Sequence, residues 1–95
     1  MIYKYKIDEV AAVQLLEAAI WYEQKGIGLG DDLVLCFEEG IETICRSPFL
    51  EIRHRHLRLY NINHFPYQII YSVEGDMITV VAFFHAKRDP KNWKK

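Results

Sequence analysis

Three side chains near the end of the chain could act on a phosphodiester. His85, Lys87 and Arg88 come just after residues 77–84, which are mostly apolar. A histidine can serve as general acid or base near neutral pH, and a neighbouring lysine or arginine can stabilise the charge of a pentavalent phosphate. This pattern fits a metal-independent ribonuclease. The alternative is a strand end followed by a cationic tail, in which Trp93 holds the tail to a sheet as an apolar plug.

A second basic segment precedes these residues, with arginines at Arg53, Arg55 and Arg58. Guanidinium groups bind phosphates and carboxylates through paired hydrogen bonds. Charged residues also protect an edge strand from aggregation, and we favour this second interpretation.

Two histidines in the same segment, His54 and His56, would share one face of a strand, a spacing that can bind zinc. No cysteine accompanies them, and Glu51 falls on the other face. We therefore predict exposed or phosphate-contacting histidines and no metal site. The sequence also contains no phosphate-binding glycine loop, so no cofactor is expected.

The charges are distributed unevenly. Residues 1–50 carry nine acidic and four basic side chains, whereas residues 51–95 carry eight basic and four acidic ones. Either the basic half binds an acidic partner or the charges are simply solvated. No apolar run approaches the ~20 residues of a membrane span, and no signal peptide is expected. Cys36 and Cys45 are interpreted as free thiols in a reducing compartment.

The pattern of apolar residues predicts the elements that position these groups. Residues 2–7 alternate as a strand does, and residues 9–25 form a helix whose apolar stripe is Val13, Leu16 and Ile20 with Ala12 and Ala19. A glycine turn leads to a second helix with buried Leu33, Phe37, Ile41 and Ile44, in which Gly40 indicates close packing. Strands at 51–59, 67–73 and 77–84 follow, the last one central.

This order predicts one α+β domain over residues 1–95. Its elements run β-α-α-β-β-β, and the helical hairpin packs on one face of a mostly antiparallel four-stranded sheet.

Three segments resemble a known family: "EAAIWYEQKGIGLGDDL", "RSP" and "FPYQIIYSVEGDMITVVAFFHAKRDPKNW". They are similar to the RelE/ParE superfamily, the toxins of bacterial type II toxin–antitoxin modules, and most of all to its ParE, or plasmid-stabilisation, branch. The resemblance implies a cytoplasmic protein whose antitoxin folds onto it. The antitoxin would lay helical segments in the groove of the hairpin and add to the sheet. The groove candidates are Leu16, Ile20, Leu33, Phe37 and Ile41. The free toxin could form a homodimer through the same groove.

The resemblance implies one of two routes to growth arrest. RelE-like members cut mRNA in the ribosomal A site, whereas ParE-like members inhibit DNA gyrase. Nuclease members typically carry an arginine where this chain has Gln68, and some end in a catalytic Tyr or His where it has Trp93. The matching Arg88 is present, and ParE-like members also carry a histidine at His85.

These departures favour a gyrase-directed binder that is not an enzyme. Its target-contact candidates are Arg53, Arg55, Arg58, His85, Lys87, Arg88 and Trp93. The alternatives are a ribosome-dependent endoribonuclease using His85, Lys87 and Arg88, and a toxin-fold protein that only binds its antitoxin.

Overall fold

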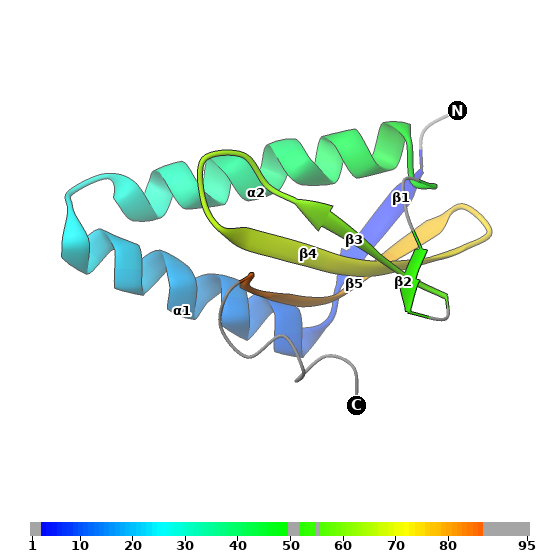
Figure 1. Cartoon of the computed structure of the whole chain (residues 1–95), viewed down its shortest axis with the longest axis horizontal. Helices are drawn as coiled ribbons and strands as arrows, with labels where there is room; N and C mark the ends of the chain where they lie inside the picture. The colour runs from blue at the N-terminus through cyan, green and yellow to red at the C-terminus, as the bar shows by residue number, and fades with distance from the viewer. Residues whose placement is uncertain (1–2, 50–51, 55, 87–95) are drawn as a thin grey trace.

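Two helices form an antiparallel hairpin, as predicted. The computed structural model describes residues 3–49, 52–54 and 56–86, with α1 at Glu9–Lys25 and α2 at Leu29–Arg46 (Figure 1). Between them Gly28 has φ +90°, a left-handed conformation that glycine adopts without strain. The helix α2 stops before Ser47-Pro48, because proline disfavours the helical conformation in the residue that precedes it. Neither helix is long and apolar enough to cross a membrane, within the residues described.

A mixed sheet lies against the hairpin, and the predicted α+β fold is confirmed. Its strands are β1 (Lys4–Ile7), β2 (Ile52–His54), β3 (Leu57–Asn61), β4 (Tyr67–Glu74) and β5 (Met77–His85), in the order β1-β5-β4-β3-β2. Of the described strand pairs, β1–β5 is parallel and the others are antiparallel. Both helices cover the same face of the sheet (Figure 1). The predicted central strand, β5, indeed lies between β1 and β4.

The basic segment differs from the single strand predicted over residues 51–59. His54 pairs with Leu57, so the chain turns back between them and gives two short strands, β2 and β3. The predicted alternation of faces therefore does not continue through the segment. Leu59 packs on the face away from the helices, whereas Tyr60 packs on the face that they cover. Since neighbours alternate along a strand, Arg58 shares the helix-covered face with Tyr60.

The predicted stripe of α1 is wrong except for Ala19, which packs against the core, because the helix buries another face. Ala11 and Ala18 are buried, and Leu15 and Tyr22 pack beside them. Val13, Leu16 and Ile20 point outward, with about half of each side chain exposed. Apolar residues surround α1 on most sides, so periodicity alone did not select the buried one. The buried side is the one that carries the small alanines, because small side chains let the helix lie close to the sheet.

The predicted core face of α2 is confirmed. Leu33, Phe37, Ile41 and Ile44 are all buried, and they belong to one cluster with the helix-facing residues of β4 and β5. A Cβ on Gly40 would lie 3.1 Å from both the Ile69 side chain and the Tyr60 ring, which confirms the close packing expected there.

Both cysteines are free thiols, as predicted. Cys36 is buried and Cys45 is half-buried in the core that α2 covers. Burial raises the pKa of each thiol, and for Cys36 the nearby carboxylates of Glu39 and Asp32 raise it further. Such thiols are poor nucleophiles, so we assign them a packing role.

Glu23 fixes the start of α2, a role that sequence patterns did not indicate. Its carboxylate accepts hydrogen bonds from the backbone N–H groups of Gly28 and Gly30, both at 3.0 Å. The first N–H groups of a helix have no partner within the helix, so a carboxylate at this end is favourable. These hydrogen bonds hold the pKa of Glu23 below its ordinary value, against a smaller opposing effect of burial.

Neutralising Glu23 should weaken the fold at neutral pH but not in acid. A carboxylate with a lowered folded-state pKa stabilises the protein above its unfolded-state pKa, and this contribution is lost as the pH falls through the folded-state value. The unfolding midpoint of Glu23→Gln should therefore lie below that of the wild type at neutral pH, with a gap that closes below about pH 4.5. Thermal unfolding of both proteins between neutral pH and a pH below about 4.5 measures this gap. Glu17→Gln, an exposed neutralisation on the same helix, should open no comparable gap.

Gln14 closes the edge of β5 where β1 ends. The last backbone bond between these segments joins the Asp8 N–H to the Val80 carbonyl. Further along, the N–H of Phe83 donates to the Gln14 side-chain oxygen at 2.7 Å. A side chain of α1 thus takes the place of a strand partner, which buried backbone groups require.

Removing the Gln14 acceptor should lower the free energy of unfolding. Gln14→Leu leaves the Phe83 N–H without its side-chain acceptor, which should cost about 1–3 kcal/mol. Gln14→Glu keeps an acceptor oxygen at nearly the same length and should avoid most of that loss. Denaturant titration of both variants measures the difference, and equal losses would contradict this role for Gln14.

Candidate functional site

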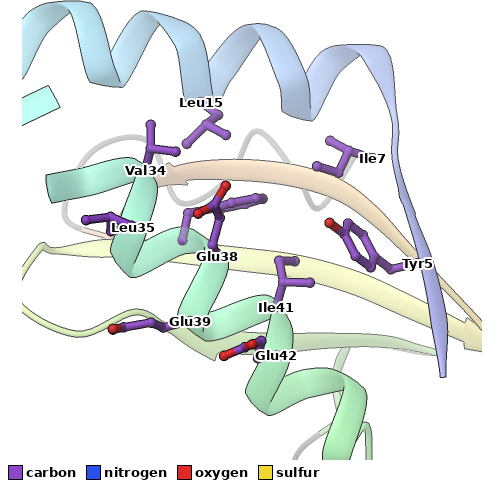
Figure 2. A pocket seen from close by; sticks show the side chains of 10 residues that line it. Tyr5, Ile7, Leu15, Val34, Leu35, Glu38, Glu39, Ile41 and Glu42 are labelled. Atoms are coloured by element: carbon purple, nitrogen blue, oxygen red, sulfur yellow. The ribbon is translucent and has the colours of Figure 1, made fainter. Parts of the chain in front are cut away.

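A groove opens between the hairpin and β1. The helices are joined at one end and lie further apart at the other, where β1 runs beside them (Figure 1). The groove has a volume of about 520 Å³, and Tyr5 and Ile7 of β1, Leu15 of α1 and one face of α2 line it. Figure 2 shows these side chains converging from three elements. Residues far apart in the sequence therefore form one concave surface.

The floor of the groove is apolar and its border is acidic. Phe37 and Ile41 are almost fully buried beneath it, whereas Glu38, Glu39 and Glu42 on the same helix line its rim. Among the described residues, none of these carboxylates forms an ion pair. The groove thus combines an apolar surface with carboxylates that have no cationic partner in the described part of the chain.

The edge of β1 next to the groove can accept another strand. The Lys4 and Asp8 N–H groups donate toward the β5 side, to the Asp76 and Val80 carbonyls. Backbone groups alternate along a strand, so those of Tyr5 and Ile7 point to the opposite edge. Among the described strands β1 pairs only with β5. An extended segment placed beside β1 would therefore meet free donors and acceptors.

The groove candidates from the sequence separate into three kinds. Leu16 and Ile20 are half exposed on the outer side of α1. Phe37 and Ile41 line the groove from below. Leu33 has no exposed surface and lies in the core. Sequence reasoning missed Tyr5 and the three glutamates. Their signal was a second, partly acidic face of α2 beside the buried one.

His85 ends β5 against an aromatic cluster. Its ring lies 5.3 Å from that of Tyr67, which stacks on Phe83 at 4.9 Å and contacts Tyr22 edge-on at 6.1 Å. Phe65 also meets Tyr22 edge-on, with the ring centres 5.0 Å apart. The histidine is half-buried. Its proposed catalytic neighbours Lys87 and Arg88, and also Trp93, lie outside the described residues.

Gln68 faces away from the helices and is already engaged. Its amide nitrogen donates to the side-chain oxygen of Asn61 on β3 at 3.0 Å. The two residues are directly paired across β3 and β4. A neutral amide pair therefore occupies the position where a nuclease of the resembled superfamily typically has an arginine.

The basic segment supplies one described cation with a clear contact. The Arg58 guanidinium lies 4.8 Å from the centre of the Phe49 ring, a cation–π contact, and Phe49 meets Tyr3 edge-on at 6.2 Å. Arg55 and the side chain of Arg53 lie outside the described residues. Arg58 thus has a packing role, whatever else it contacts.

His56 and His64 are the histidines of this region whose side chains the structure describes. His56 is exposed in the turn between β2 and β3, and the side chain of His54 lies outside the described residues. His64 is exposed in a loop with φ 69°. In the part of the chain that the structure describes, no three His, Cys, Asp or Glu residues are grouped as metal ligands.

Comparison with known proteins identifies a family and a solved structure that resemble this chain. Residues 5–90 match the family model described as the ParE toxin of the type II toxin–antitoxin system, parDE. A solved structure described as the chromosomal ParDE TA system from P. aeruginosa superposes with a TM-score of 0.71. It is 15% identical in sequence, and the match covers 90% of this chain and 98% of that chain. No curated protein matches the sequence. The structural likeness shows the fold, and the family model spans most of the chain: the protein belongs to the ParE toxin family of type II toxin–antitoxin systems.

Proposed function

We propose that this protein is a bacterial toxin that arrests growth by binding and inhibiting DNA gyrase in the cytoplasm, and that a cognate antitoxin neutralises it. Membership of the ParE family supports a toxin–antitoxin role. The solved ParDE relative supports an antitoxin partner, because that structure is described as a TA (toxin–antitoxin) system. The choice of gyrase over mRNA as the target rests on the residues of the chain itself.

The observation that carries the choice of target is the Gln68–Asn61 hydrogen bond. Cleavage of a phosphodiester without a metal needs cations placed around the phosphate and a group that transfers protons. A neutral amide with its donor already committed cannot supply the cation. The partly buried His85 packs its ring against Tyr67, which gives the histidine a structural role independent of proton transfer.

The antitoxin site that we propose is the groove with the adjoining edge of β1. An amphipathic helix would place its apolar side chains over Phe37 and Ile41, and an extended segment would pair with Tyr5 and Ile7. The exposed Leu16 and Ile20 would extend this contact along α1. The candidates for gyrase contact remain those expected from the sequence, namely Arg53, Arg55, Arg58, His85, Lys87, Arg88 and Trp93.

Two assays on one preparation of the antitoxin-free chain test this proposal. The first measures supercoiling by purified gyrase, and the second maps mRNA ends on translating ribosomes. We expect inhibition in the first and no A-site cleavage in the second. Cleavage that His85→Ala abolishes would identify a nuclease instead. Inactivity in both assays would leave a protein that only binds its antitoxin.

A further inference from the structure

The acidic border of the groove specifies the chemistry of the segment that fills it. We propose that the groove binds a cationic amphipathic helix of the partner, with lysine or arginine side chains one turn apart placed opposite Glu38 and Glu42. This inference rests on the proposed function in one respect, namely that a partner protein occupies the groove. It adds the charge, the spacing and the salt dependence of that partner.

The surplus of negative charge belongs to the whole hairpin. Residues 9–46 carry eight acidic side chains and two basic ones, Lys25 and Arg46. Lys25 lies at the hairpin tip, where its amino group is 4.8 Å from the centre of the Trp21 ring. Arg46 lies in the last turn of α2, where a cation offsets the helix dipole. The groove between these positions therefore has a negative field that would attract a cationic segment.

The spacing of the acids matches one turn of a helix. Glu38 and Glu42 are four residues apart on α2, so their Cβ atoms are about 5–6 Å apart. Lysines four residues apart on a partner helix have the same separation. Ile41 lies between these acids and Tyr5 of β1, and Val34 and Leu35 extend the apolar lining one turn before Glu38 and Glu39 (Figure 2). A helix with one apolar stripe flanked by cations would thus satisfy both parts of the groove.

The same charges argue against the other occupants. A second copy would bring an equally acidic hairpin, and its exposed Lys4 and Lys6 alternate with Tyr5, so they lie on the sheet face away from the groove. Like charges placed together across an interface are unfavourable. Nucleic acid is disfavoured on the same ground, because its phosphates would face the three carboxylates of the border.

A displayed helix library tests the inference with the full-length chain as bait. Each member is a helix of about 18 residues with a fixed leucine stripe, and its flanking positions vary among Lys, Glu, Gln and Ser. Three baits are compared: the wild-type chain, Glu38→Gln/Glu42→Gln, and the control Glu74→Gln/Asp76→Asn in the exposed β4–β5 turn. The control removes the same charge from two residues that do not line the groove.

We expect lysine to be enriched on the wild-type and control baits at flanking positions four residues apart. The best binder should weaken about 1.5- to 5-fold for each groove carboxylate removed, and it should also weaken as salt rises from about 0.05 to about 0.3 M. Leu35→Asp, which places a charge in the apolar lining, should prevent its binding. Binders without lysine enrichment, an affinity that ignores Glu38→Gln/Glu42→Gln, or no binder at all would overturn the inference.

Analytical sedimentation of the chain alone tests the remaining possibility, which is that a second copy of the chain occupies the groove. A dimer that Leu35→Asp dissociates would assign the groove to a second copy and overturn the inference. None of these measurements uses gyrase or cell growth. A chain that lacks gyrase activity can still select cationic helices, and a gyrase inhibitor can fail to select them, so the two proposals stand or fall separately.

Discussion

Phe83→Ala is expected to lower the free energy of unfolding by about 3–5 kcal/mol. Phe83 has no exposed surface. Its ring stacks on Tyr67 at 4.9 Å and meets Phe37 of α2 edge-on at 5.2 Å. Removing the ring leaves a cavity between the hairpin and the sheet. For a domain of this size the unfolding midpoint should fall by about 12 °C or more.

Phe83→Leu provides the matched control, because it retains most of the apolar volume and loses only the ring contacts. It should cost clearly less than the alanine variant in the same denaturant titration. Similar losses for both variants would mean that the ring stacking, rather than the filled volume, supports the hairpin. A loss below about 1 kcal/mol for Phe83→Ala would contradict its place at the centre of the core.

Gly30→Ala should also be strongly destabilising, although alanine is the better helix former. An added Cβ would lie 2.6 Å from the backbone carbonyl oxygen of Ala19 and 3.1 Å from the Glu23 carboxylate. Neither α1 nor α2 can move away without losing the hydrogen bonds of Glu23 to the turn. The overlap should outweigh the gain of about 1 kcal/mol in helix propensity and leave a net loss of about 2 kcal/mol.

Gly40→Ala is the control for this prediction, because it also replaces a buried glycine of α2. Its Cβ would meet only side-chain atoms, Ile69 Cδ1 and Tyr60 Cε2, both at 3.1 Å. These atoms can shift by a few tenths of an ångström, so we expect a net change within about 1 kcal/mol in either direction. Calorimetry of the two variants compares them directly. A larger loss at Gly40 than at Gly30 would contradict the assigned contact between the helices.

Local sequence patterns sufficed for most of the fold. The stripe of α2 and the alternation of Tyr67, Ile69, Tyr71 and Val73 predicted the core faces of both elements, and the structure confirms them. They succeeded because the buried residues of α2 recur at helical spacing and those of β4 recur at every second position, so each set shares one face. The strand β5 departs from simple alternation: a register shift opposite Ile70/Tyr71 places Val81 with Ala82 on the far face.

The pattern failed on α1, where apolar residues occur on several faces. Choosing between Ala11 and Leu16 as the buried side requires knowing how closely the helix approaches the sheet. That distance is set by tertiary contacts such as the packing of Ala11 and Ala18 in the core and the hydrogen bond between Gln14 and Phe83 of β5. The division of the basic segment at His56 was missed for a related reason, because a tight turn between charged residues leaves no break in hydrophobic periodicity.

The candidate site was only partly predictable. The superfamily resemblance pointed to the hairpin, but the groove depends on the angle between α1 and α2 and on β1 lying beside them. No periodicity in one segment encodes that arrangement, so Tyr5 and the acidic border were missed. The neutral character of Gln68 was visible in the sequence. Its hydrogen bond to Asn61 was not, because it joins two strands.

The most direct test of gyrase as the target is plasmid supercoiling by the purified enzyme, titrated with the antitoxin-free chain. We predict that the chain inhibits supercoiling, and that the proposed cognate antitoxin restores the activity when added in equimolar amount. The Phe83→Ala variant, whose fold should be strongly destabilised, is purified and assayed in the same way. It controls for any inhibition that comes from the preparation and not from the folded chain. Full supercoiling at a large molar excess of folded wild-type chain would contradict the assignment of gyrase as its target.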